Sequence, residues 1–273
     1  MKKYLTYLLM ILLLASCEEQ TDWELQPGKD DLIVVDGIIT NEQEVQKIIL
    51  SKPVAALNEQ PQPVTGAIIL VSSNQLVYSF HEDPSSPGTY LSDKEFSGIR
   101  NRTYSLLITS GGKVYSAKAV LAPPLPIRNF LRYQKNGNEN KYHITWVADP
   151  YNSEKAAMYD ILLDWSSAQG YENMNPDSCK ARLYYYTLPT LDVSEIFAPS
   201  LEKTTFPSGT IITERKYALS DEHAAFIRAL LIETAWQGGF FNTASANVPT
   251  NLSDGAIGFF GACGVVEMQE TVK

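Results

Sequence analysis

The first hydrophobic segment of the chain is a mostly aliphatic run from Leu8 to Ala15, which follows Lys2 and Lys3. A basic start, an apolar run and small residues before a cleavage point form the pattern of a secretory signal. The run is too short to span a bilayer, which takes roughly 20 apolar residues. The pattern therefore predicts an export leader over residues 1–16.

Between residues 31 and 122, short apolar runs alternate with turn residues, without helical periodicity. Two of the turns, Ser72-Ser73-Asn74 and Gly111-Gly112, are typical of hairpins. Several short strands at this spacing are typical of a β-sandwich. The expected strands cover residues 32–39, 45–50, 67–71, 76–80, 89–91, 104–109 and 114–120.

The segment Ala122-Pro123-Pro124-Leu125-Pro126 interrupts this pattern. Proline donates no hydrogen bond to a β-ladder and stiffens the chain, so such a segment is typical of a linker. We therefore expect a domain boundary here, with an N-terminal sandwich over residues 31–122 and a second domain over residues 127–273. The alternative is a proline-rich loop inside one larger sheet.

The sequence of the second domain is rich in Tyr, Trp and β-branched residues, which also predicts mostly strands. They cover residues 129–134, 141–147, 158–165, 181–187, 256–262 and 265–269. One helix is expected over residues 220–237, with Ser220 as its cap and Gly238-Gly239 at its end. Its apolar positions recur at helical spacing, which predicts a face packed into the core rather than a binding face. Those positions are Phe226, Ile227, Leu230, Leu231, Thr234 and Ala235. The expected fold class is mainly β, with two β-sandwich-like domains, the second containing one amphipathic helix.

The end of the leader, Leu14-Ala15-Ser16-Cys17, resembles the bacterial lipobox. In that motif the cysteine thiol is diacylated and the leader is removed, so the resemblance implies that Cys17 is an acylated N-terminus. Two or three acyl chains hold a protein on a bilayer effectively permanently, because each buried CH₂ contributes roughly 0.8 kcal/mol. An ordinary signal peptide with an incidental cysteine is the alternative. Polar residues with Pro27 and Gly28 predict a tether over residues 17–30.

The pair Glu18-Glu19 resembles the acidic export tag of Bacteroidota surface lipoproteins. The resulting prediction is an outer-membrane lipoprotein that faces the cell exterior, with the periplasmic face as the alternative. Removal of the leader leaves 20 Lys and Arg against 31 Asp and Glu, a formal charge of −11. Such a chain is repelled by nucleic acid, which we exclude as a partner.

The remaining cysteines, Cys179 and Cys263, could form a disulfide in an oxidising envelope, or could be two buried thiols. The three histidines, His81, His143 and His223, lie far apart in the sequence, without the spacing of a zinc site. We expect each histidine to face solvent or to cap an element. The sequence also lacks a nucleophile elbow and a phosphate-binding loop. We therefore expect no catalytic residue, no metal and no cofactor.

Aromatic residues are the best candidates for binding, because they are enriched at interface hot spots and bind sugars and peptides. Tyr184, Tyr185 and Tyr186 are consecutive, so a strand would point the first and third one way and the second the other. Core packing is the alternative for each, and the 242–255 loop could equally be a packed connection. The candidate contacts are Tyr184, Tyr186, Phe240, Phe241, Asn247 and Asn251.

Several segments resemble the Bacteroidota lipoprotein family catalogued as domain of unknown function 4249. They are residues 32–42, 64–70, 87–90, 102–116, 239–241, 247–252 and 256–260, nearly the whole chain after the leader. The resemblance implies surface lipoproteins, often encoded beside TonB-dependent outer-membrane receptors, without assigned catalytic residues. Separately, Gly66-Ala67 and Pro87-Gly88-Thr89-Tyr90 resemble carboxypeptidase-regulatory-like and transthyretin-like β-sandwiches.

These inferences together predict a non-catalytic binding protein, accessory to TonB-dependent nutrient uptake. Its expected partners are the membrane, through the lipid anchor, a TonB-dependent β-barrel receptor and a small nutrient such as a glycan or peptide. A cell-surface adhesin or structural envelope protein is the alternative.

Overall fold

Strand β1 (Ile33–Thr40) opens the described part of the chain, and its side chains alternate between a buried and a more exposed face. The computed structural model describes residues 32–54, 59–137, 140–149, 155–189, 204–234 and 248–273. They belong to one compact unit, Leu32–Lys273. The expected leader (1–16), the tether (17–30) and Cys17 lie outside the described residues.

The largest sheet has eight strands in the order β14-β1-β2-β5-β4-β3-β6-β7. All eight strands contribute side chains to one hydrophobic core, so the sheet folds back on itself as a sandwich does. Both expected hairpin turns are present, because Asn74 and the Gly111–Gly112 pair adopt positive φ. The other strands are β2 (Lys47–Ser51), β3 (Ile68–Ser73), β4 (Leu76–Glu82), β5 (Thr89–Ser92), β6 (Thr103–Ser110), β7 (Lys113–Val120) and β14 (Ala256–Cys263).

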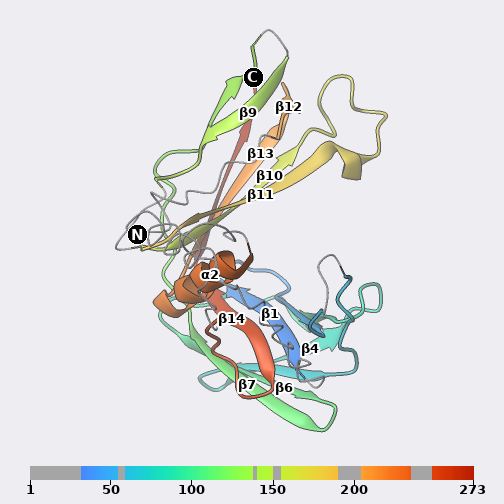
Figure 1. Ribbon diagram of the computed structural model, residues 1–273, viewed down its shortest axis with the longest axis vertical. Coiled ribbons are helices and arrows are strands. Elements are labelled where there is room, and N and C mark those ends of the chain that lie inside the picture. Colours follow the sequence, from blue (N-terminus) through green and yellow to red (C-terminus); the bar gives the residue numbers. More distant parts are fainter. Residues whose placement is uncertain (1–31, 55–58, 138–139, 150–154, 190–203, 235–247) are drawn as a thin grey trace, which may run out of the picture. The chain divides into compact units, whose positions relative to one another are not determined.

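The last strand of this sheet, β14, comes from the C-terminal part of the chain and pairs in parallel with β1, from Ile33 opposite Ala256 to Thr40 opposite Cys263 (Figure 1). The close pairing requires glycine at position 258, where φ is 94° and a Cβ would lie 2.2 Å from the Val35 carbonyl oxygen. This pairing corrects the expected domain limits. A second domain over residues 127–273 would include β14, whereas the structure places β14 in the first sheet.

Asn251 joins the two ends of the eight-stranded sheet. Its Nδ2 donates to the carbonyl oxygens of Lys118 on β7, at 3.0 Å, and Phe260 on β14, at 2.7 Å. Its Oδ1 accepts from the amide of Phe260 at 3.1 Å. The side chain therefore bridges strands that are far apart in the sheet order.

The remaining strands form a second sandwich around a separate core. A four-stranded sheet has the order β11-β10-β13-β15, and a three-stranded sheet has the order β12-β9-β8. The chain enters the second sandwich at the expected proline segment, returns to the first between β13 and β14, and enters the second again at Gly264. The Gly264 amide donates to the Ala122 carbonyl at 2.8 Å. The strands are β8 (Arg132–Lys135), β9 (Lys141–Trp146), β10 (Ala157–Asp164), β11 (Lys180–Thr187), β12 (Phe206–Pro207), β13 (Ile211–Ala218) and β15 (Val265–Thr271), and a short 3₁₀ helix, η1 (Pro176–Cys179), precedes β11.

Helix α2 (Asp221–Thr234) starts where the sequence predicts, with Ser220 Oγ accepting from the amide of His223 at 3.2 Å. The helix face that we expected in the core is only partly buried, because Ile227 is buried but 41% of Leu230 is exposed. Ala235 and the expected end at residue 237 lie outside the described residues. The expected fold class, mainly β with sandwich-like sheets, is confirmed, and the described residues contain one α-helix.

Candidate functional site

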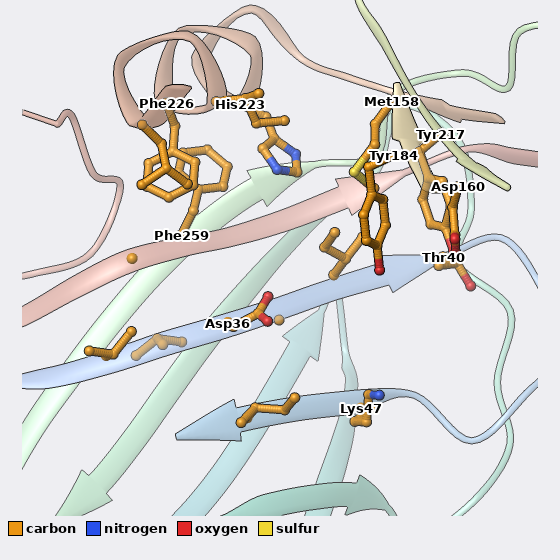
Figure 2. Close-up of a pocket in the computed structure, with 18 of the residues that line it drawn as sticks. Asp36, Thr40, Lys47, Met158, Asp160, Tyr184, Tyr217, His223, Phe226 and Phe259 are labelled. Atoms are coloured by element: carbon orange, nitrogen blue, oxygen red, sulfur yellow. The ribbon is translucent and has the colours of Figure 1, made fainter. Parts of the chain in front are cut away.

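A cleft with a volume of about 1270 Å³ lies between the eight-stranded sheet, the four-stranded sheet and helix α2. We call it the inter-sheet cleft. Strands β1, β2, β5 and β14 provide its floor, and strands β10, β11 and β13 provide its ceiling. Figure 2 shows the ring of Tyr184 reaching from the ceiling toward β1, on which Asp36 points into the cleft.

The floor is the outer face of the first sandwich. On β1, Ile33 and Val35 are buried in the core, so the alternating residues Val34, Asp36 and Ile38 line the cleft. The neighbouring strands add mainly aliphatic side chains and one lysine. They are Lys47 and Ile49 on β2, Leu91 on β5, and Ile257 and Phe259 on β14.

The ceiling is one face of the four-stranded sheet, and it is rich in tyrosine. Tyr184 and Tyr186 line the cleft, whereas Tyr185 between them is buried in the second core and donates from its hydroxyl to the Ala148 carbonyl at 3.0 Å. Tyr217 on β13 completes the group. Burial raises the pKa of the Tyr184 phenol, so this hydroxyl is protonated at neutral pH and can donate a hydrogen bond.

An ion pair between a buried carboxylate and a solvent-exposed guanidinium lies in the ceiling. Asp160 is only 4% exposed, and its two carboxylate oxygens accept from Nε and Nη2 of Arg182 at 2.7 and 2.5 Å. These hydrogen bonds to Asp160 raise the pKa of Arg182. The guanidinium also lies 5.5 Å from the ring centre of Tyr184, so it stacks on the tyrosine that projects into the cleft.

Two residues that follow β1 connect the floor to the second sandwich. Glu42 forms an ion pair with Arg215 on β13. Asn41 accepts from the Val265 amide at 2.5 Å and donates to the Val265 carbonyl at 3.3 Å. These contacts join the two sandwiches beside the cleft, so side-chain contacts as well as the covalent chain connect its walls.

Helix α2 closes one side of the cleft through His223. This imidazole stacks on Phe259 with 4.6 Å between ring centres, and its Nδ1 lies 3.7 Å from Sγ of Cys263. Burial lowers the pKa of His223 to about 4 and raises that of the Cys263 thiol to about 12. Both groups are therefore neutral near pH 7, unlike the thiolate–imidazolium pair of a nucleophilic cysteine.

Asp36 and Lys47 differ from the other charged groups of the cleft. Within the described ranges, neither side chain has a hydrogen-bond or ion-pair partner. The Asp36 carboxyl is reached by solvent but stands between the walls of the cleft. This burial raises its pKa, and Lys47 only partly offsets the effect.

Comparison with known proteins identifies the family. Residues 18–269 match the model described as "Domain of unknown function (DUF4249)". The chain belongs to this family. The match covers all the strands of the inter-sheet cleft, so the DUF4249 family model includes the whole site. No curated protein is significantly similar to the chain.

Two solved structures are distantly similar to this DUF4249 chain. The FN1–FN3 domains of chicken CNTN1 share 9% identity with a TM-score of 0.27, over 68% of this chain and 60% of theirs. A DUF4785 family protein from Legionella pneumophila shares 12% identity with a TM-score of 0.21, over 68% of this chain and 52% of its own. The chain thus spans less than two thirds of either structure.

The structure brings only part of the predicted site together. Tyr184 and Tyr186 line the cleft. Asn251 instead forms hydrogen bonds with backbone groups of β7 and β14, where the two ends of the eight-stranded sheet meet. Phe240, Phe241 and Asn247 lie outside the described residues. The disulfide considered for the remaining cysteines is not formed, because Cys179 and Cys263 are both buried, free thiols.

The histidines have different environments. His81 is exposed and lies 2.9 Å from Asp93, whereas His223 is buried, contrary to the expected solvent-facing or capping role. In the part of the chain that the structure describes, no group of three or more His, Cys, Asp or Glu side chains could hold a metal ion. Among the same residues, no helix has the length and apolar character needed to cross a membrane.

Proposed function

We propose that this chain is a lipid-anchored, outer-membrane binding protein that acts without catalysis as an accessory to TonB-dependent uptake. The observation that carries the proposal is the inter-sheet cleft, which combines an aliphatic floor, three tyrosines and a few charged groups. Cavities of this composition are typical of ligand sites. The lipobox-like residues before Cys17 support an anchor outside the cytoplasm.

A lipid anchor would place this cleft on the same membrane as a nutrient receptor. Confinement to one membrane raises the effective concentration of two partners, so modest contacts suffice for association. The formal charge of −11 after loss of the leader, from 20 basic and 31 acidic residues, favours a receptor surface with a basic rim.

The first experiment tests the anchor. Cys17→Ala should release the protein from the membrane fraction and abolish acylation, while Cys179→Ala, which removes a thiol far from the lipobox in the sequence, should leave both unchanged. Protease added to intact cells then distinguishes the outer surface from the periplasm. Continued membrane attachment of Cys17→Ala would contradict the anchor.

The second experiment tests the uptake role. A tagged chain, solubilised from outer membranes in detergent at low salt, should copurify with a β-barrel receptor, and the association should weaken as salt is added. Purification as a lone monomer, together with normal growth of a deletion strain on every nutrient tried, would reject this role.

An adhesin is the second candidate. It is supported by exposed apolar side chains on the outer face of the first sheet, far in strand order from β1 and β14, where Ile68 is 64% and Val114 is 60% exposed. Such exposed apolar groups are typical of contact surfaces. Loss of surface attachment in Ile68→Ser and Val114→Ser variants, with uptake unchanged, would favour this candidate.

A further inference from the structure

The inter-sheet cleft presents two opposite charges, on Asp36 and Lys47, that lie near each other but form no ion pair or hydrogen bond within the described residues. Asp160 is held by Arg182, and Arg215 by Glu42, but Asp36 and Lys47 have no such partner. A ligand that enters the cleft removes water from both groups. Burial of an unpaired charge is costly, so a bound molecule must supply compensating charges or dipoles.

The sheet register fixes how these two charges are spaced. Asp36 on β1 is directly opposite Ile49 on β2, and Lys47 is two residues before Ile49. Lys47 is therefore the diagonal neighbour of Asp36 on the same face, at a Cβ separation of about 7 Å. The pair thus offers a carboxylate and an ammonium to one ligand, from backbone positions about as far apart as residues i and i+2 of an extended peptide.

The rest of the cleft surface favours apolar side chains over sugar rings. Its floor is mostly aliphatic, with Ile38, Ile49 and Ile257 beside Asp36, and such side chains offer no hydrogen bonds to sugar hydroxyls. An uncharged glycan would also desolvate Asp36 and Lys47 without supplying a charge to either. The tyrosines opposite, including Tyr184, which is 51% exposed, can pack on apolar side chains and donate hydrogen bonds to carbonyl oxygens.

We propose that the inter-sheet cleft binds a short peptide with apolar side chains, whose terminal ammonium pairs with Asp36 while one of its carbonyl or carboxylate oxygens meets Lys47. The cleft volume of about 1270 Å³ exceeds the roughly 300–1,000 Å³ that is usual for small-molecule sites, so several residues fit. The inference rests on the proposed function as a binding protein and specifies its ligand.

The test uses the full lipidated chain in detergent and a mixture of tetrapeptides made from Leu, Val, Phe and Tyr. Captured peptides are identified by mass spectrometry, and the affinity of the most enriched one is measured by calorimetry. Asp36→Asn should weaken its binding about tenfold to a hundredfold, as expected for loss of a charge-assisted hydrogen bond. The matched control Asp93→Asn, which removes an exposed carboxylate outside the cleft, should bind as the unchanged protein does.

Acetylation of the peptide N-terminus provides the decisive comparison. The acetylated peptide should bind the unchanged protein as weakly as the free peptide binds Asp36→Asn, and Asp36→Asn should not weaken it further. An unchanged thermal midpoint for Asp36→Asn shows that folding is intact. The inference is overturned by no enrichment of any peptide, by equal binding of the acetylated form, or by binding of maltotetraose instead. Receptor copurification without peptide binding would reject this inference and leave the uptake proposal standing.

Discussion

Arg182 holds both carboxylate oxygens of Asp160, with Nε 2.7 Å from Oδ1 and Nη2 2.5 Å from Oδ2. The side chain of Asp160 is 4% exposed, whereas that of Arg182 is 55% exposed. A buried carboxylate thus depends on a cation that solvent reaches, and the two arms of the guanidinium also fix its orientation.

Arg182→Ala should therefore destabilise the fold by about 2–4 kcal/mol, because it leaves the buried charge of Asp160 unpaired. Arg182→Lys should recover only part of this, since an ammonium does not reproduce the two-pronged contact. Urea unfolding measures both. The double variant Asp160→Leu with Arg182→Met removes both charges and should be more stable than Arg182→Ala. Wild-type stability of Arg182→Ala would show that Asp160 does not need its partner.

Tyr184 and Tyr185 are adjacent in sequence but should respond differently to substitution. Tyr185→Ala removes a buried ring and its hydrogen bond to Ala148, with an expected loss of about 3–5 kcal/mol. Tyr184→Ala removes a half-exposed ring and should cost less than about 1 kcal/mol. Thermal unfolding of the two single variants makes the comparison. Equal losses would mean that β11 does not present its faces as described.

Asn251→Asp should loosen the seam between β7 and β14. The substitution loses two donated hydrogen bonds and places a carboxylate against the carbonyl oxygens of Lys118 and Phe260, so we expect a loss of about 2–4 kcal/mol. Asn136→Asp, an exposed position before β9, is the matched control and should be nearly neutral. Hydrogen exchange should show faster opening of β14 in Asn251→Asp only. Equal protection of β14 amides in the two variants would show that Asn251 does not hold β7 and β14 together.

Acid should destabilise the protein through His223. The pKa of this imidazole is lowered by burial from 6.5 to about 4, so between these pH values the unfolded chain binds a proton that the folded chain does not. Stability is therefore full above pH 6.5 and falls as the pH decreases, by about 2 kcal/mol from this group between pH 7 and 4.5.

The variant His223→Phe keeps an aromatic ring against Phe259 and removes the titration. Its free energy of unfolding should decrease less between pH 7 and 4.5 than that of the unchanged protein. His81→Gln alters an exposed histidine and should retain the full acid sensitivity. Parallel pH profiles for all three proteins would assign the acid sensitivity to other groups.

Local sequence patterns predicted the local parts of this structure. The alternation of side chains along a strand was enough to place Tyr184 and Tyr186 on one face and Tyr185 on the other. Ser220 was enough to place the start of α2. In both cases the relevant interaction lies within a few residues, so the pattern contains the information.

The cleft floor and the domain limits could not be predicted in this way. Asp36 looks like an isolated polar residue in an apolar run, and only the register with β2 brings it near Lys47. Similarly, β14 looks like a strand of the C-terminal half, because no local signal states that its partner is β1. His223 has the position of a capping-turn residue, and only Phe259 and Cys263 from a distant strand bury it.

The pairing of β1 with β14 also sets an order of events during folding. Strand β1 cannot obtain its outer neighbour until the chain has been made as far as Cys263, more than two hundred residues later. Until then one edge of the first sheet has unpaired amide and carbonyl groups, which favour misassembly with other chains. A chain exported in an unfinished state would expose that edge, so the sheet that begins with β1 is completed only after strands β8 to β13 of the second sandwich have been made.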